Sequence, residues 1–284
     1  MSKRKTLFNE SLCQNVRTYQ QYMDLLIEMA ISSFEWKNLP DTVDARYIEM
    51  ELFTSGCLVY FNDDVIGNLC LNCINSGQFD VYGYPLIRTA YSRYNNYQKL
   101  LKTSNSVIIW NNYMHTNSQT NINGFARRLS NIDRIIDINV NAQKTPVLIQ
   151  GNDKQRLSLL NLYKEFDGNS PFIFGDKGLD LNSLKAINTQ APYISDKLYE
   201  LKTKLWNEAL TYLGITNVNY QKKERMVSDE VLRSQGGTIA NRLSRLNSRR
   251  EAVKRINKMF DTNIEVNFID TSEDSFNKGG DDFE

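Results

Sequence analysis

The sequence lacks any apolar run long enough to cross a membrane. A spanning helix needs about 18–20 consecutive apolar residues, and no stretch of the 284 residues reaches that length. The first residues also lack the apolar core of a secretory signal peptide. We therefore expect a protein that is made and kept in a cytoplasm and has no membrane partner. Its four cysteines should be reduced there: Cys13, Cys57, Cys70 and Cys73.

Residues suited to catalysis are scarce. The only histidine, His115, lies in a polar stretch rich in Asn and Thr, and no nucleophile motif surrounds it. We interpret it as a residue of a surface loop. No Gly-x-x-x-x-Gly-Lys-Ser/Thr sequence occurs, which excludes a P-loop that hydrolyses nucleotides. We therefore expect no enzymatic activity and no cofactor.

A zinc site is indicated only by the spacing of Cys70 and Cys73. Structural zinc needs four ligands, and only Cys57 and His115 could complete the set. Cys70 and Cys73 would also point to opposite faces of a strand, because side chains alternate along it. We therefore expect no metal site.

A metal-dependent nuclease would need several carboxylates around a metal pair. Adjacent acidic residues occur at Asp63-Asp64 and at Asp229-Glu230, but nothing in the sequence links the two pairs. A nuclease remains the weaker alternative.

Charge is unevenly distributed along a chain that is close to neutral. The net charge of +1 does not indicate nucleic-acid binding by the whole chain, and 41% apolar residues exclude wholesale disorder. Lys3-Arg4-Lys5 opens the sequence as a basic arm. Residues 233–258 hold eight basic residues against Glu251, and the tail is acidic at Glu273, Asp274, Asp281, Asp282 and Glu284. Each run can also be a solvated face. One alternative function follows from them: DNA binding by a basic helix face formed by Arg242, Arg245, Arg249 and Arg250.

Apolar periodicity predicts several long helices. The first spans 11–36 and ends before Pro40, and a shorter one follows at 44–53. A helix over 121–140 carries one apolar stripe. Another begins at Asn152 or Asp153 and ends at Gly168. The last two run from Pro192 to Leu213, before Gly214, and from Ile239 to Phe260.

Strands are predicted mainly between residues 56 and 84. The segments 58–61 and 65–74 flank a turn at 62–64, and a second turn is expected at 75–77. The segment 91–101 is ambiguous. Further strands are expected at 107–110, 145–149, 171–174 and 264–269.

The segment Tyr220–Val231 lies between the last two long helices and has no apolar stripe. It carries three basic residues, Lys222, Lys223 and Arg225, and three acidic ones, Glu224, Asp229 and Glu230. Tyr220, Gln221 and Met226 complete the part that we single out. Two helices of about 22 residues would make a hairpin about 33 Å long. From its residues alone, the segment is a surface turn with exposed ion pairs, each of which stabilises little.

Several blocks in the same order resemble the head–tail connector (upper collar, or portal) proteins of small short-tailed bacteriophages. They are Phe34–Pro40, Ser76–Tyr82, Asn139–Ile149, Ala191–Leu198, Trp206–Glu208, Lys222–Val231 and Ser248–Asn257. The resemblance runs from about Tyr22 to Phe268 and is weak over 84–126 and 232–247.

The resemblance implies a portal fold, α+β and mainly α. It has long tilted stem helices, a small β-rich wing or clip region, and a helix–loop–helix that lines a central channel. The expected subdivision is a basic arm (1–10), N-terminal helices and wing (11–120), stem (121–215), channel loop (216–235), C-terminal stem helix and strand (236–270) and acidic tail (271–284).

The family also implies a function and partners. The expected protein is one subunit of a homo-oligomeric ring, typically a dodecamer, at the portal vertex of the virion, assembled in the host cytoplasm. Double-stranded DNA would pass through the ring. The expected protein partners are the major capsid protein, the packaging ATPase and the lower collar or tail protein.

Two departures from the family bear on the site residues. Better-known members place two lysine rings in the channel; one falls on Lys197, whereas Asn188 occupies the other position and Lys185 lies close by. With the loop residues, the DNA-facing set is then Lys185, Lys197, Lys222, Lys223 and Arg225. In some members a longer N-terminal arm contacts a packaging RNA. Because Lys3, Arg4 and Lys5 form a shorter arm, we expect it to meet a packaging partner and leave the RNA open.

Overall fold

The computed structural model describes residues 3–143, 147–149, 184–186, 192–216 and 236–269. The backbone divides into two compact units, one formed by residues up to Asn131 together with those from Thr203 onward, and one formed by Ile132–Lys202. In chain order the first unit begins with α1 (Lys3–Ile31), β1 (Phe34–Lys37) and α2 (Ala45–Ser55). None of the helices in the described ranges is long and apolar enough to cross a membrane.

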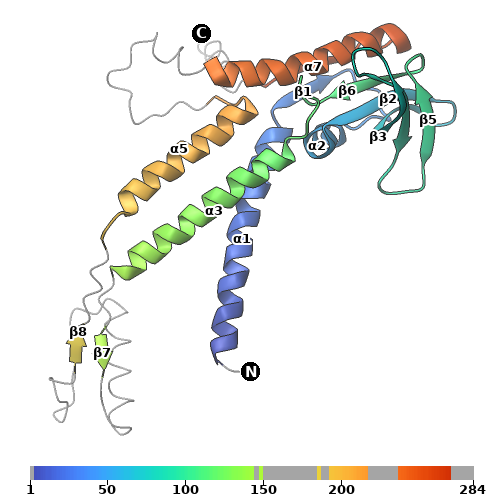
Figure 1. Ribbon diagram of the computed structural model, residues 1–284. Helices are drawn as coiled ribbons and strands as arrows, with labels where there is room; N and C mark the ends of the chain where they lie inside the picture. The colour runs from blue at the N-terminus through green and yellow to red at the C-terminus, as the bar shows by residue number, and fades with distance from the viewer. Residues whose placement is uncertain (1–2, 144–146, 150–183, 187–191, 217–235, 270–284) are drawn as a thin grey trace, which may run out of the picture. The chain divides into compact units, whose positions relative to one another are not determined.

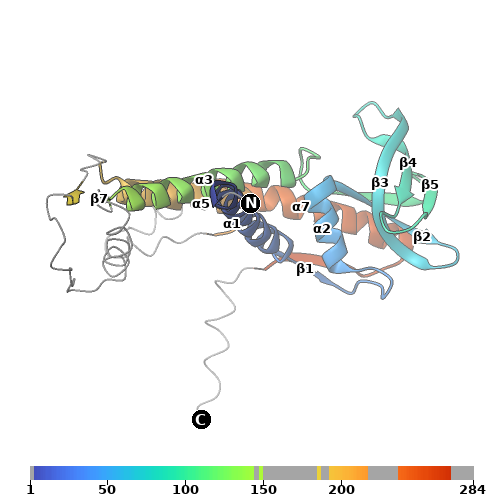
Figure 2. The same ribbon diagram turned by 90° about the horizontal axis from the view of Figure 1, so that it is seen from below.

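An antiparallel sheet of five strands, in the order β5-β4-β3-β2-β6, forms the β part of the first unit. Its strands are β2 (Cys57–Asp63), β3 (Gly67–Phe79), β4 (Pro85–Tyr91), β5 (Gln98–Lys102) and β6 (Ser106–Trp110). The helix α7 (Gly236–Phe260) packs along β6 (Figure 2). After α7 the chain turns back as β9 (Glu265–Phe268), which pairs with β1.

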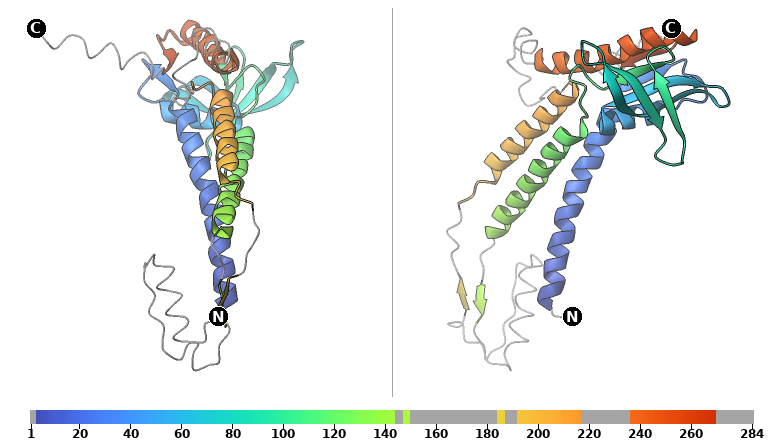
Figure 3. Two further views of the ribbon diagram at one scale, coloured as in Figure 1. Left: turned by 90° about the vertical axis from the view of Figure 1, so that its left-hand side faces the viewer. Right: turned by 45° about the vertical axis from the view of Figure 1, so that its right-hand side comes forward.

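The main core lies between one face of the sheet and the helices α2 and α7. Leu52 of α2, Leu58 of β2 and Ile256 of α7 are among its fully buried side chains. Each such side chain stabilises the fold by roughly 1.5–3 kcal/mol relative to an exposed one. The helix α2 contacts both α1 and the sheet (Figure 3), so the core joins helical and β parts into one unit.

The second helix confirms the prediction over 44–53 and extends two residues further, to Ser55. The Asp44 carboxylate accepts hydrogen bonds from the backbone N–H groups of Arg46 and Tyr47, which caps the first turn. Gly56 ends the helix in the left-handed region, at φ 85°. A side chain there would also collide, because an added Cβ would lie 2.8 Å from the backbone of Asn117.

The second unit contains the C-terminal part of α3 (Gln119–Ala142) and the N-terminal part of α5 (Ser195–Leu213), both visible in Figure 1. It also contains the strand pair β7 (Val147–Ile149) and β8 (Leu184–Ala186). The helix predicted over 121–140 is confirmed by α3, and the strand predicted at 145–149 is confirmed over the three residues of β7. The helix predicted from Asn152 and the strand at 171–174 lie outside the described residues.

The first helix was predicted with wrong limits at both ends. It begins at Lys3, so the backbone of Lys3, Arg4 and Lys5 belongs to α1, and it ends at Ile31. The hydroxyls of Ser32 and Ser33 bond to carbonyls of the last turn, Ser32 to Glu28 at 2.7 Å. Residues 34–37 form β1, because Phe34 pairs with Phe268 far along the chain. No local pattern reveals such a partner.

The turn predicted at 75–77 is also wrong. β3 continues to Phe79, and the pairing with β4 is irregular between Ser76 and Phe79, where Gly77 has φ 83°. The chain turns after Asp80, whose carboxylate accepts hydrogen bonds from the N–H groups of Tyr82 and Tyr84. The glycine therefore marks a bulge in a long strand.

Other expectations differ by small shifts. The ambiguous segment 91–101 contains the end of β4 and most of β5. The helix expected from Pro192 begins at Ser195, and the last helix begins at Gly236 instead of Ile239. The strands predicted at 58–61, 107–110 and 264–269 are confirmed by β2, β6 and β9. The fold is α+β and mainly α, as predicted.

Candidate functional site

Lys197 lies in the first turn of α5 and is exposed. A residue of α3 holds that helix end: Asn139 Oδ1 accepts from Ile194 N at 3.1 Å and from the Ser195 hydroxyl at 2.9 Å. Asn139 Nδ2 donates to the Pro192 carbonyl at 2.9 Å. A cation beside the positive end of a helix adds to a potential that attracts anions. Lys197 is therefore an exposed cation at a helix N-terminus, and its contact with DNA stays a prediction.

The same two helices are joined further along by an ion pair. Lys202 Nζ lies 2.7 Å from Asp133 Oδ1, with both side chains about a quarter exposed. This pair and the Asn139 contacts fix how α5 runs beside α3 within the second unit. They leave Lys197 as the exposed basic residue of the first turn of α5.

The channel loop itself lies outside the described residues. This applies to Tyr220, Gln221, Lys222, Lys223, Glu224, Arg225, Met226, Asp229 and Glu230. For Lys185 the structure gives the backbone, which pairs with Leu148 in the β7–β8 sheet, but not the side chain; the same holds for the side chains of Lys3, Arg4 and Lys5. The predicted roles of these residues stay predictions.

The two helix ends that flank the channel loop are described, and they are bound to each other. Arg242 Nε of α7 donates to the Gly214 carbonyl at 2.9 Å, and its Nη2 donates to the Thr216 hydroxyl at 2.8 Å. Asn241 Nδ2 donates to the Thr211 carbonyl at 3.0 Å. We call these contacts the helix clasp. The clasp therefore joins the described residues that precede the channel loop to those that follow it.

Gly214 makes this clasp possible. It ends α5 at φ 81°, and an added Cβ would lie 2.8 Å from the backbone N and Cα atoms of Arg242. Only glycine combines that conformation with so close an approach. The sequence identified the glycine as a helix stop, but not its contact with α7.

The predicted basic face of Arg242, Arg245, Arg249 and Arg250 is wrong, because Arg245 and Arg249 are buried. The guanidinium of Arg249 is almost fully buried and makes two hydrogen bonds to Glu49 of α2, at 2.8 and 2.7 Å. It also donates to the Asn111 carbonyl at 2.9 Å and lies 3.9 Å from the ring centre of Phe34. Trp36 Nε1 donates to the same carboxylate at 2.9 Å.

Two neighbouring arginines also bond to other elements: Arg245 is buried, whereas Arg250 is exposed. Arg245 Nη1 donates to the Ser118 hydroxyl at 2.6 Å and its Nη2 to the Tyr212 carbonyl at 3.1 Å. Burial lowers the pKa of Arg245 below its ordinary value. Arg250 donates from Nη2 to Asn267 at 2.8 Å. These side chains fasten α7 to its surroundings, so the alternative of DNA binding by this face loses the residues on which it depended.

A sequence signal for this burial existed. Arg245 and Arg249 share one helical stripe with Ala252 and Ile256, at spacings of four, three and four residues. Ala252 and Ile256 belong to the main core. An arginine on the apolar face of a helix is more readily explained by a buried partner than by a solvent contact. The partner, Glu49, is 200 positions away and could not be identified locally.

The cysteines lie as the alternation along a strand predicted. Cys70 is buried in the main core, whereas Cys73 packs on the opposite face of the sheet. Cys57 Sγ and Cys73 Sγ are 3.6 Å apart, and this contact lowers the pKa of Cys57. Burial raises the pKa of Cys70. No group of three or more potential ligands that could hold a metal occurs among the described residues.

The remaining catalytic candidates are explained by structure. His115 is an exposed loop residue, as predicted, and stacks on Trp110 with ring centres 3.9 Å apart. Asp63 accepts hydrogen bonds from the Tyr97 hydroxyl at 2.6 Å and from Lys99 Nζ at 2.9 Å. These two partners hold the pKa of Asp63 well below its usual range. Its neighbour Asp64 is fully exposed, and Asp229-Glu230 lies outside the described residues.

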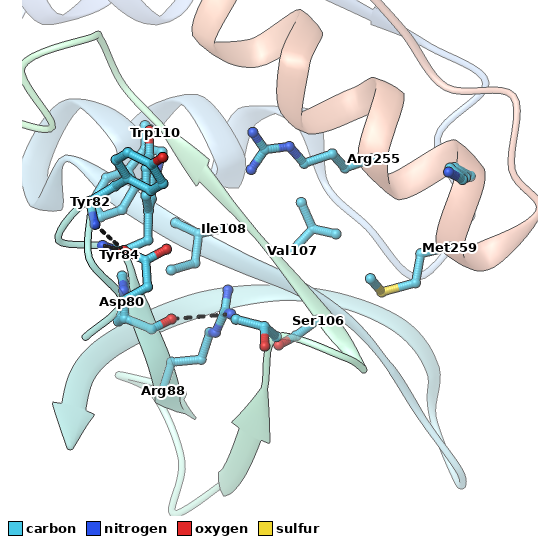
Figure 4. A pocket seen from close by; sticks show the side chains of 13 residues that line it. Asp80, Tyr82, Tyr84, Arg88, Ser106, Val107, Ile108, Trp110, Arg255 and Met259 are labelled. Atoms are coloured by element: carbon cyan, nitrogen blue, oxygen red, sulfur yellow. Dashed lines mark hydrogen bonds between the residues drawn. The ribbon is translucent and has the colours of Figure 1, made fainter. Parts of the chain in front are cut away.

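A cavity of about 650 Å³ lies between α7, β6 and the turn from β3 to β4. Figure 4 shows Tyr82, Tyr84 and Trp110 gathered at one end and Arg255 and Met259 reaching in from α7. Of the described residues, those of the helix clasp are not part of its lining. No sequence pattern indicates this cavity, because its walls come from three separate segments.

Comparisons with known proteins agree with the resemblance. The family model described as Phage Connector (GP10) matches residues 4–272. The solved portal and tail of native bacteriophage P68 matches with a TM-score of 0.53 at 15% identity, covering 98% of this chain and 95% of that chain. An HK97 family phage portal protein from Corynebacterium diphtheriae matches with a TM-score of 0.39 at 10% identity, covering 90% and 94% of the two chains. A TM-score of that size does not establish a common fold.

Proposed function

Since the chain belongs to the Phage Connector (GP10) family and is a head–tail connector, or portal, subunit, we propose that it assembles into a ring of identical subunits through which double-stranded DNA is packaged and ejected. The ring is typically a dodecamer and occupies one vertex of the virion. The observation that carries the proposal is the family match over residues 4–272. The role is structural and needs no catalytic residue.

The channel loop is proposed to meet the DNA. In support, the helix clasp binds the end of α5 to the start of α7, so the two flanking helices stay joined without help from the loop. The loop then acts as a gate or check on DNA movement. It is flanked by 121–215 and 236–270 as stem, with 11–120 as the wing.

Each proposed DNA contact is weak. A ring multiplies each side chain by the number of subunits, and every neutralised phosphate makes the slope of log affinity against log salt steeper by about 0.9. A tight grip would stop movement, so contacts must be exchangeable and independent of base sequence. Lysine suits this as a flexible point charge. The proposed DNA-facing residues are Lys185, Lys197, Lys222, Lys223 and Arg225, and the acidic residues Glu224, Asp229 and Glu230 limit the grip.

The proposed partners follow the order of assembly. The capsid protein holds the ring at its vertex, the packaging ATPase docks while the head fills, and the lower collar or tail replaces it afterwards. Lys3, Arg4 and Lys5, at the start of α1, are proposed to contact a packaging partner. Assembly takes place in the host cytoplasm and the product is part of the virion.

A deletion tests whether the channel loop acts on DNA while the rest of the subunit forms the ring. Removing Tyr220–Val231 should leave ring assembly unchanged in electron micrographs, because the clasp residues Thr211, Gly214 and Arg242 remain. The amount of nuclease-protected DNA per particle should fall. A variant with Lys222, Lys223 and Arg225 changed to Gln should show the same loss, whereas Lys254→Gln, at an exposed residue of α7, should not. Failure of the deleted protein to assemble would show that the loop is structural.

A further inference from the structure

The cavity beside α7 carries an unbalanced positive charge. Arg88 lines it, is only 4% exposed, and its Nε has no hydrogen-bond partner among the described residues. Arg255 and Lys258 line it from α7 and are exposed. The one acidic residue of the lining, Asp80, accepts hydrogen bonds from two backbone N–H groups. Three cations therefore face one carboxylate that is already engaged.

A buried guanidinium without an anion is unfavourable. The Nη2 atom of Arg88 donates to the Pro85 carbonyl at 3.4 Å. Burial lowers the pKa of Arg88 below its ordinary value. A carboxylate bound in the cavity would supply both the missing hydrogen-bond acceptor and the missing charge. The lining thus indicates an anionic ligand.

The rest of the lining is aromatic and apolar. Tyr82, Tyr84 and Trp110 stand together at one end, and Val107, Ile108 and Met259 add apolar side chains to the wall (Figure 4). Such a wall accommodates a ring or a large apolar side chain. The ligand that fits both parts carries an aromatic group next to several carboxylates.

One segment of this chain has that composition. Residues 281–284 read Asp-Asp-Phe-Glu, an aromatic ring flanked by three carboxylates. We propose that this acidic segment docks in the cavity of its own subunit. Phe283 enters the aromatic end, and the carboxylates meet Arg88, Arg255 and Lys258.

The chain between β9 and this segment is long enough. β9 runs back along α7, so Phe268 lies beneath Arg242, which is 4.3 Å above its ring centre. From Arg242 to Lys258 is 16 residues, about 24 Å along the helix, and the path must also pass around a helix about 10–12 Å wide. From Ile269 to Phe283 is 14 residues, which span roughly 46–50 Å when extended. Glu273 and Asp274 are too close to Ile269 to reach, so the proposal applies to residues 281–284.

Zero-length crosslinking with a carbodiimide tests the docking in the full-length protein. It joins a lysine amine to a carboxylate only when the two are in contact, and mass spectrometry of peptides locates the bond. We expect Lys258 to couple to Asp281, Asp282 or Glu284 several-fold more than Lys37 does. Lys37 is the internal control, because it is exposed on β1, opposite Glu265 at the start of β9. Equal coupling to both lysines would overturn the proposal.

Variants that should fold normally sharpen the test. Phe283→Ala and Arg255→Gln should each lower the Lys258 coupling several-fold, although neither removes a reacting group. Lys254→Gln removes the same charge from α7 outside the cavity and should have no effect. Mixing subunits labelled with ¹⁴N and ¹⁵N identifies the chain that supplies the tail. Docking within one chain gives no crosslink between a ¹⁴N peptide and a ¹⁵N peptide, so a substantial share of such mixed crosslinks would contradict it.

Discussion

Breaking the ion pair between Glu49 and Arg249 should strongly destabilise the first unit. Glu49→Gln keeps the shape of the side chain but removes the charge that faces the Arg249 guanidinium. Both side chains are buried, at 3% and 2% exposed, so water cannot replace the lost carboxylate. Removing one partner of a buried pair costs about 3–5 kcal/mol of the free energy of unfolding.

The structure supports a value within that range. The pair has two hydrogen bonds of 2.8 and 2.7 Å, and Glu49 also accepts the Trp36 indole N–H at 2.9 Å. An amide can satisfy the indole but not the charge. For a unit of roughly 200 residues, a loss of 3–5 kcal/mol lowers Tm by about 6–20 °C. Urea unfolding followed by circular dichroism measures the change.

A double variant separates the charge from the packing. Replacing both residues, as Glu49→Gln with Arg249→Met, removes the unpaired charge and should recover at least about 1 kcal/mol relative to Glu49→Gln alone. Glu35→Gln is the matched control, since Glu35 pairs with Lys37 at the surface and should change stability by no more than about 0.5 kcal/mol. A loss below about 1 kcal/mol for Glu49→Gln, or strict additivity of the two changes, would refute the reasoning.

Two further predictions concern stability: one compares two glycines whose replacement should change stability in opposite directions, and the other concerns the loss of stability at low pH. Gly214→Ala should destabilise the protein by about 1–3 kcal/mol, because residue 214 has a left-handed conformation and a Cβ there meets the backbone of α7. Gly124→Ala, in an open site of α3, should instead stabilise it by about 0.5–1 kcal/mol. Thermal unfolding compares the two variants, and equal effects would contradict the clasp geometry. The lowered pKa of Asp63 adds stability that is present above about pH 4 and is lost as the pH falls toward the folded-state pKa. Asp63→Asn should therefore lose less stability than the wild type between pH 5.5 and 3 in urea unfolding, and parallel losses would contradict this.

Local chemistry made part of the fold predictable. Asp44 and Gly56 are capping residues in their usual positions, so the limits of α2 could be placed from the sequence to within two residues. The apolar stripe of α3 likewise predicted a helix because its spacing is periodic. In both cases the information lies within one element. The resemblance then placed these elements in a portal fold.

Elements whose partners lie far along the chain could not be predicted from local patterns. The sequence predicts the segment of β1 as the end of a helix, since Phe34 and Trp36 continue an apolar pattern and their partners in β9 lie some 230 positions away. It predicts Arg249 as a solvent-facing cation for the same reason, because Glu49 is distant in sequence. For the site, Lys197 could be placed on an exposed helix start, whereas the charges of the channel loop carry no local signal of what they meet.

Single-particle electron microscopy of the purified full-length protein shows whether the chain builds a ring through which DNA can pass. We expect closed rings of identical subunits around a central hole wide enough for a DNA duplex, with the channel loop contributing density at the hole. A protein that stays monomeric at concentrations suited to assembly, or rings whose hole is too narrow for a duplex, would contradict it.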